Sequence, residues 1–157
     1  EWRPSWVGVL CGAAVFGVWL ALLPDGASDK AAWPRALTDT NPGLAAAWLS
    51  LRTIGYVVVT PLAEELVFRG YLTREFWRDE DTSASVGTFA WRGLIVSALV
   101  FGAFHGRLWL AGIAAGAAFA LVLYRRRSIG DAVLAHAVTN GLLAAYALMS
   151  GNWAAWS

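Results

Sequence analysis

The chain has 157 residues, enough for one domain. Hydrophobic residues make up 58% and charged residues 15%, whereas soluble domains are roughly 45–50% apolar and about 25% charged, so an ordinary water-soluble protein is disfavoured. The net charge of +1 gives no support for a nucleic-acid partner, and the single cysteine, Cys11, excludes a disulfide framework and a thiolate metal cluster.

Five apolar segments follow one another along the chain, at residues 6–23, 44–77, 93–105, 108–124 and 129–149. Crossing the hydrocarbon core of a bilayer takes about 20 apolar residues. The first, fourth and fifth segments meet this length, the second meets it with charges inside it, and the third is short enough for a tilted or re-entrant helix. The sequence therefore predicts an all-α polytopic membrane bundle of about five transmembrane or re-entrant helices, in contact with membrane lipid.

The arginines predict the orientation of this bundle. If the helices alternate in direction, one side carries Arg3, Arg74, Arg78, Arg92 and Arg125, Arg126 and Arg127, and the other carries Lys30, Arg35 and Arg107. The positive-inside rule then places the arginine-rich side in the cytoplasm, with the triple-arginine run as a topology anchor.

Polar side chains interrupt these apolar segments at four places. They are Glu64 and Glu65 with Arg69, then His105, His136 and Asn140. Ionisable groups inside membrane segments are rare and mark functional sites by default. The structural alternatives are an ion-pair network for the glutamates, a helix-end position for His105, and interhelical hydrogen bonds for His136 and Asn140.

Helical spacing separates the roles of the two glutamates. Glu65 and Arg69 are four residues apart and share a helix face, so they can form an ion pair. Glu64 is rotated by about 100° from Glu65 and can point elsewhere. Glu65 is therefore expected to form a structural ion pair with Arg69, and Glu64 stays available for catalysis.

Depth along the helices brings the polar positions together. At a rise of about 1.5 Å per residue, Glu64 and His105 each lie about 20 Å from the arginine-rich side, and His136 lies roughly 13 Å from it. Asn140 is one turn deeper than His136. We expect the four side chains to share one cavity that opens towards the cytoplasm.

Pro61 stands one turn before Glu64. A proline inside a helix lacks an N–H and tends to kink the axis. The sequence predicts a kink that widens the space at the carboxylates and leaves a carbonyl near Val57 to water; a purely structural proline is the alternative.

Three motifs resemble those of the CPBP family, the CAAX prenyl protease and bacteriocin-processing intramembrane peptidases. "EELVFR" fits EExxxR, "FGAFH" fits FxxxH and "HAVTN" fits HxxxN, in this order and on apolar segments. The resemblance covers roughly residues 44–149. The ending "TNGLLAAYALMSGNWAAW" is also similar to a bacterial branch associated with exosortase sorting systems.

The resemblance implies a single protease domain over residues 1–157, with a catalytic core at about 44–149 after a leading helix and loop at 1–43. It implies that Glu64 and His105 activate a water, that His136 and Asn140 donate hydrogen bonds to the oxyanion, and that Glu65 and Arg69 support the site. A glutamate in a low-dielectric cavity takes up a proton more readily, as a general base must.

The resemblance also implies the setting. The protein is expected in the bacterial inner membrane, without a cofactor, cutting a membrane-associated or lipid-anchored peptide. The family name suggests a prenylated tail, whereas a bacterial member suits a peptide leader or sorting tail. Because the chain begins at Glu1 and not at Met, an N-terminal exosortase-like domain or partner is a further expectation.

Two other functions fit the same residues. Glu64, His105 and His136 match the His₂Glu ligand set of catalytic zinc, although the usual helical HExxH is absent. A membrane scaffold or immunity protein would bind a peptide in the cavity without cutting it. Transport is disfavoured because the segments show no inverted repeat.

Overall fold

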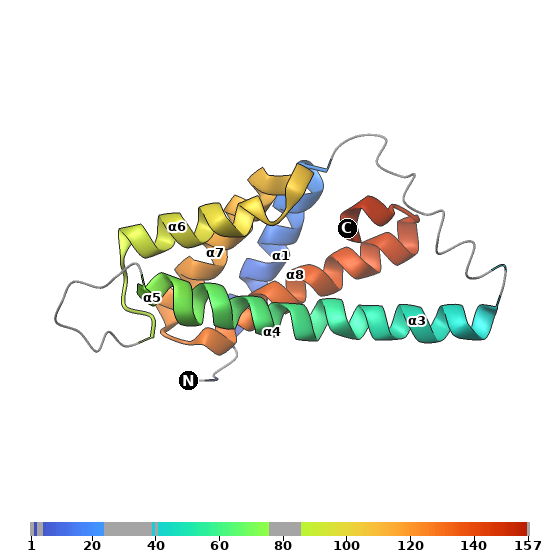
Figure 1. The fold of residues 1–157 in the computed structure, drawn as a ribbon, viewed down its shortest axis with the longest axis horizontal. Helices are drawn as coiled ribbons and strands as arrows, with labels where there is room; N and C mark the ends of the chain where they lie inside the picture. The colour runs from blue at the N-terminus through green and yellow to red at the C-terminus, as the bar shows by residue number, and fades with distance from the viewer. Residues whose placement is uncertain (1, 3–4, 24–38, 40, 76–85, 157) are drawn as a thin grey trace.

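The computed structural model describes residues 2, 5–23, 39, 41–75 and 86–156, and it is built from helices (Figure 1). The first segment forms α1 (Trp6–Ala21), and the third to fifth form α6 (Trp91–Ala103), α7 (Trp109–Arg126) and α8 (Ile129–Ser150). Short 3-10 helices stand before α7 (η4, Gly106–Leu108) and at the C-terminal end (η5, Trp153–Trp156). The all-α prediction is confirmed, and no strand occurs in the part of the chain that the structure describes.

The second predicted segment is one long helical run with changes of helix type. It passes through α3 (Pro42–Ile54), the π-helical η2 (Gly55–Val59), α4 (Thr60–Glu65), the π-helical η3 (Leu66–Leu72) and α5 (Thr73–Glu75). The run begins where Asn41 caps it, because the Asn41 side chain accepts a hydrogen bond from the Leu44 N–H. Pro42 at the first helical position suits the same start.

The helical run passes through Pro61 without a break, from η2 into α4 (Figure 1). The proline follows the π-helical turn η2, where the Thr60 N–H donates to the Gly55 carbonyl, five residues back. The kink at Pro61 stays a prediction. A π turn is a common local adjustment within α-helices, often at functional sites.

Among the described residues, three helices are long and apolar enough to cross a membrane: Pro42–Leu72, Gly106–Arg126 and Ile129–Ser150. The helices α1 and α6 are shorter but also apolar. Apolar side chains such as Leu51, Val58 and Val67 are exposed along the long run, and α3 projects beyond the other helices (Figure 1). Helices of this length whose apolar side chains are exposed are suited to contact with lipid.

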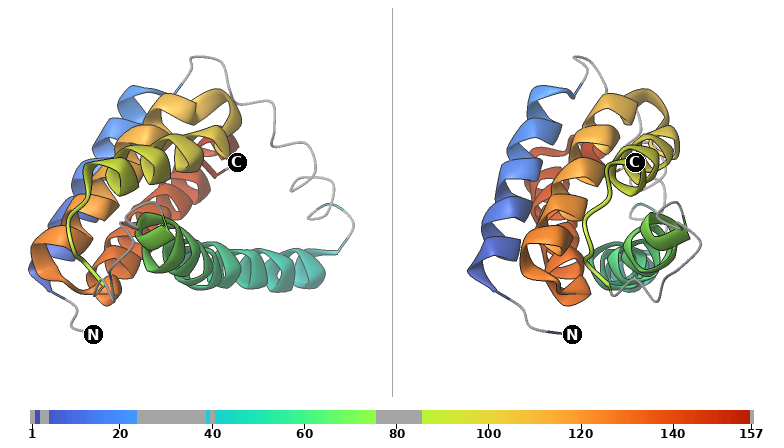
Figure 2. Two further views of the ribbon diagram at one scale, coloured as in Figure 1. Left: turned by 60° about the vertical axis from the view of Figure 1, so that its left-hand side comes forward. Right: turned by 90° about the vertical axis from the view of Figure 1, so that its left-hand side faces the viewer.

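Glycines allow two helix pairs to approach closely. A Cβ added to Gly12 of α1 would lie 2.4 Å from the Ala135 carbonyl oxygen of α8, and one added to Gly102 of α6 would lie 2.4 Å from Ile113 Cγ1 of α7. In lipid the hydrophobic effect does not drive helices together, and small residues at such crossings let the backbones approach closely enough for van der Waals packing. Figure 2 shows α1, α6, α7 and α8 side by side, with the long helix diverging from them.

Several helix ends meet around Asp131 and form the arginine-rich end of the bundle. The Asp131 carboxylate accepts from the Ser5 N–H at 2.7 Å and from Arg126 Nε at 3.0 Å. The start of α6 joins them, because the Phe89 and Tyr124 rings are in contact. Arg92 and Arg125–Arg127 thus share one end, as the alternating order predicts, while Arg3, Lys30, Arg35, Arg78 and the Arg74 side chain lie outside the described residues.

Candidate active site

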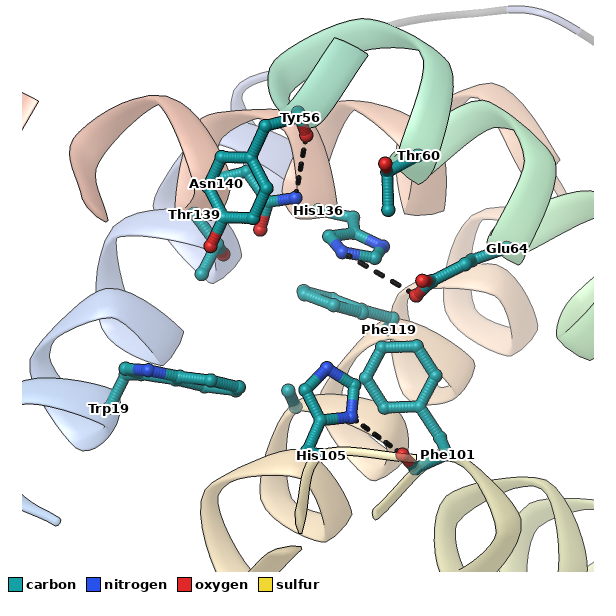
Figure 3. A pocket seen from close by; sticks show the side chains of 11 residues that line it. Trp19, Tyr56, Thr60, Glu64, Phe101, His105, Phe119, His136, Thr139 and Asn140 are labelled. Atoms are coloured by element: carbon teal, nitrogen blue, oxygen red, sulfur yellow. Dashed lines mark hydrogen bonds and ion pairs between the residues drawn. The ribbon is translucent and has the colours of Figure 1, made fainter. Parts of the chain in front are cut away.

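A cavity of about 450 Å³, its open mouth included, lies between the helices. Its lining comes from α1, the long helical run, α6 with the turn that follows it, α7 and α8. The residues are Trp19, Tyr56, Thr60, Glu64, Phe101, His105, Ala115, Phe119, His136, Thr139 and Asn140. The four positions expected to meet, Glu64, His105, His136 and Asn140, all line it (Figure 3).

The two adjacent glutamates lie in different surroundings. The Glu64 side chain is 34% exposed and faces the cavity, whereas Glu65 is completely buried. Figure 3 shows Glu64 approaching His136, and its Oε2 lies 4.0 Å from His136 Nε2. The expected separation of the two carboxylates is confirmed.

Behind the cavity, Glu65 joins Arg69 to His136. Its Oε1 accepts from Arg69 Nη1 at 3.1 Å and lies 3.0 Å from His136 Nδ1. The predicted pair between Glu65 and Arg69 is confirmed, and a second contact, to His136, was not predicted. An acceptor oxygen at this distance places the proton of the imidazole on Nδ1, which turns Nε2 towards Glu64.

Arg69 is completely buried and held from several sides. Its Nη2 donates to the Gly116 carbonyl of α7 at 2.7 Å, and its guanidinium lies 4.6 Å from the centre of the Phe101 ring. A planar, always-charged guanidinium suits such a buried position between a carboxylate and aromatic rings. Arg69 thereby ties the long helix to α6 and α7.

His105 stands on the turn between α6 and η4, with its ring pointing into the cavity (Figure 3). Its Nδ1 lies 2.6 Å from the Phe101 carbonyl oxygen. A carbonyl can only accept, so Nδ1 carries the proton and Nε2 is the acceptor nitrogen. The Trp19 ring packs edge-on against the same imidazole at 5.3 Å.

Asn140 is anchored to the π-helical turn. Its Nδ2 donates to the Tyr56 carbonyl at 2.8 Å. The carbonyl predicted near Val57 to lack its helical donor is that of Tyr56, one residue earlier, and the Asn140 side chain donates to it. The physical reason is the register: in the five-residue π pattern the carbonyl that faces Pro61 belongs to Tyr56.

Sequence reasoning missed several wall residues. Trp19 lies in the first apolar segment, far from the motifs, and Phe119 lies in a run of small residues, so neither carries a local signal. Thr139 is inside the third motif, and its hydroxyl donates to the Gly12 carbonyl of α1 at 3.0 Å. Asp131 was also missed, although Ser128 and Asp131 follow a capping pattern and the Ser128 hydroxyl accepts from the Asp131 N–H.

The zinc alternative needs Glu64, His105 and His136 around a single point. Within residues 2, 5–23, 39, 41–75 and 86–156, no three His, Cys, Asp or Glu side chains form a group that could hold a metal ion. Cys11 is half-buried in α1 and unbridged. The geometry of these residues does not fit a three-ligand zinc site.

The chain was also compared with protein families, curated proteins and solved structures. The family model described as type II CAAX prenyl endopeptidase Rce1-like matches residues 46–142. Searches of curated proteins and of solved structures found no match. The matched range contains all seven fixed positions of the three motifs named above.

Proposed function

The chain belongs to the family of type II CAAX prenyl endopeptidases of the Rce1-like kind, and we propose that it is an intramembrane endopeptidase in which Glu64 and His105 activate water. Membership in this family and the three helices able to cross a bilayer make it an integral membrane protein. The observation that carries the proposal is that Glu64, His105, His136 and Asn140 line one cavity from three helical segments.

Water activation needs a base with access to solvent. Of the two glutamates only Glu64 faces the cavity, and His105 offers an acceptor nitrogen there. The water binds between these groups and attacks the peptide carbonyl, while its proton passes to Glu64. The tetrahedral intermediate then collapses, the C–N bond breaks, and the proton on Glu64 goes to the departing amine.

His136 and Asn140 are suited to stabilise the negative oxygen of that intermediate. Glu65 accepts from His136 Nδ1 and so turns the Nε2 edge of the ring to the cavity, where Nε2 donates to the oxyanion when it carries a proton. Asn140 uses one N–H on Tyr56 and keeps a second. Each preorganised donor contributes about 3 kcal/mol to transition-state stabilisation.

Glu65 and Arg69 support the site without facing it. Both are completely buried, and their ion pair neutralises a charge that lipid-level surroundings would make costly. Through Glu65 the pair also fixes the ring of His136. Their proposed role is therefore to orient a donor.

The substrate we propose is a peptide segment that is associated with the membrane or anchored by a lipid. Aromatic rings of Trp19, Phe101 and Phe119 form much of the cavity wall, and such walls suit apolar side chains. A peptide leader or sorting tail fits these walls without requiring a prenyl group. Action in the bacterial inner membrane, beside an exosortase-like domain or partner, is part of the same proposal.

The experiment that tests the proposal compares protein termini in membranes of cells that express the wild type or Glu64→Gln at equal levels. Glu64→Gln keeps the shape of the side chain but removes the base, so a new terminus should appear with the wild type alone. Arg107→Gln is the matched control, because Arg107 is exposed and outside the cavity wall. Identical termini in all three samples would contradict proteolysis and favour a protein that only binds peptide.

A further inference from the structure

We propose that Pro61 is a positioning residue: because it has no N–H, it leaves the Tyr56 carbonyl to Asn140, and this bond fixes the Asn140 amide at the cavity. The hydrogen bond itself is a property of the fold. Its effect on cleavage rests on the proposed function, in which Asn140 donates to the oxyanion.

The first step is the register of the helix before Pro61. In η2 the Thr60 N–H bonds to Gly55, five residues back and not four. In an α-helix the Thr60 N–H would bond to the Tyr56 carbonyl, but here it bonds to Gly55. In a π-helix the donor to Tyr56 would be residue 61, which is Pro61. Pro61 cannot donate, so neither register supplies Tyr56 with a helical partner.

The second step is burial. Pro61 is fully buried, and Asn140 is 5% exposed. The contact between Asn140 and the Tyr56 carbonyl is part-buried, and a carbonyl withdrawn from water without a donor costs up to about 1–3 kcal/mol. The Asn140 side chain of α8 meets this need at 2.8 Å, across the interface of the two helices.

The third step is orientation. A carbonyl only accepts, so the contact turns the NH₂ end of the Asn140 amide towards Tyr56 and its oxygen away. Tyr56, Thr60 and Asn140 all line the cavity, and Figure 3 shows the bond at its wall. The second N–H of the amide is thereby held in a defined direction at the cavity wall.

Pro61→Ala tests this device, because alanine brings an N–H. The Tyr56 carbonyl then has a helical donor in either register: the new alanine N–H in the π pattern or the Thr60 N–H in the α pattern. Asn140 should lose its partner and its fixed orientation. Two variants serve as controls: Pro42→Ala, an equivalent change at the start of α3, and lactic acid in place of Pro61, which has no ring and no N–H.

The direct readout is the amide of Asn140. The chain contains three asparagines, Asn41, Asn140 and Asn152, and no glutamine. Labelling with ¹⁵N-asparagine in detergent micelles thus gives three side-chain NH₂ signals, and Asn140→Ala identifies one of them. In Pro61→Ala the hydrogen-bonded proton of Asn140 should move upfield, while both controls should keep its wild-type position.

Cleavage gives the second readout. Pro61→Ala should lower kcat roughly tenfold with little change in KM. This is smaller than the 10²–10³-fold loss of kcat that follows removal of a whole oxyanion donor, because the Asn140 amide is misoriented but still present. In an Asn140→Ala background it should have no further effect. An unchanged Asn140 signal in Pro61→Ala, or equal kcat losses in both backgrounds, would overturn the inference. A wild type that cleaves nothing would contradict the proposed function instead, and the Asn140 signal would still decide the positioning role.

Discussion

At the scale of single residues, the site depends on two neighbouring carboxylates in unlike settings. Glu65 is completely buried in contact with Arg69 and His136, whereas Glu64 is partly exposed in the cavity. The sequence was sufficient to predict this separation, because a rotation of about 100° per residue is a fixed property of the helix. The contact of Glu65 with His136 was not predictable, because it depends on how α8 packs against the long helix.

These settings predict unequal losses of stability for the same change. Glu65→Gln leaves the buried guanidinium of Arg69 without a charged partner and should lower the free energy of unfolding by about 3–5 kcal/mol. Glu64→Gln changes a partly exposed group and should alter it by no more than about 0.5 kcal/mol. Unfolding of the two purified variants in detergent measures the difference, and equal losses would contradict the assignment of the structural role to Glu65.

At the scale of elements, hydropathy predicted where the helices lie but not how they pack. The first apolar segment looked like a leading helix outside the core, yet α1 brings Trp19 to the cavity and packs against α8 at Gly12. The π-helical turns were likewise hidden, because the sequence signals a proline but not the local register that accommodates it. Such features follow from tertiary contacts, which a single sequence does not display.

The α1–α8 contact gives a prediction with a matched control on the same helix. Gly12→Ala places a methyl group 2.4 Å from the Ala135 carbonyl oxygen and 2.8 Å from Val138 Cβ, so the helices must separate. We expect a loss of about 1–3 kcal/mol in stability and a lower cleavage rate, because Trp19 moves with α1. Gly17→Ala, where nothing lies within 4 Å of the added Cβ, should be unaffected; thermal unfolding compares the two, and equal behaviour would rule out the close crossing.

At the scale of the whole molecule, the arginine-rich end predicts the orientation in the membrane. Arg125 lies at this end and Arg107 at the far end of α7, and both side chains are exposed. In a Cys11→Ser background, Arg125→Cys should react with an impermeant thiol reagent only when the cytoplasmic face is open to it. Arg107→Cys should react in intact cells, and the reverse pattern would invert the topology.

The opening of the cavity towards the cytoplasm is a separate prediction. His105 stands at the end of α6 that is remote from Arg92, so the route into the cavity does not follow from orientation alone. A cysteine at Thr60 in the cavity wall should react from the cytoplasmic side. Reaction only from the opposite side would place the entrance there.

The central proposal is that Glu64 and water cut a peptide bond without a metal ion. The most direct measurement is the cleavage rate of a substrate peptide by purified wild type and Glu64→Gln, each with and without a chelator. We predict that the chelator leaves the wild-type rate unchanged and that Glu64→Gln lowers it by 10²–10⁴-fold, the range of general acid–base catalysis. Loss of wild-type cleavage with chelator, restored by zinc, would contradict this account, as would a Glu64→Gln variant that cleaves at the wild-type rate.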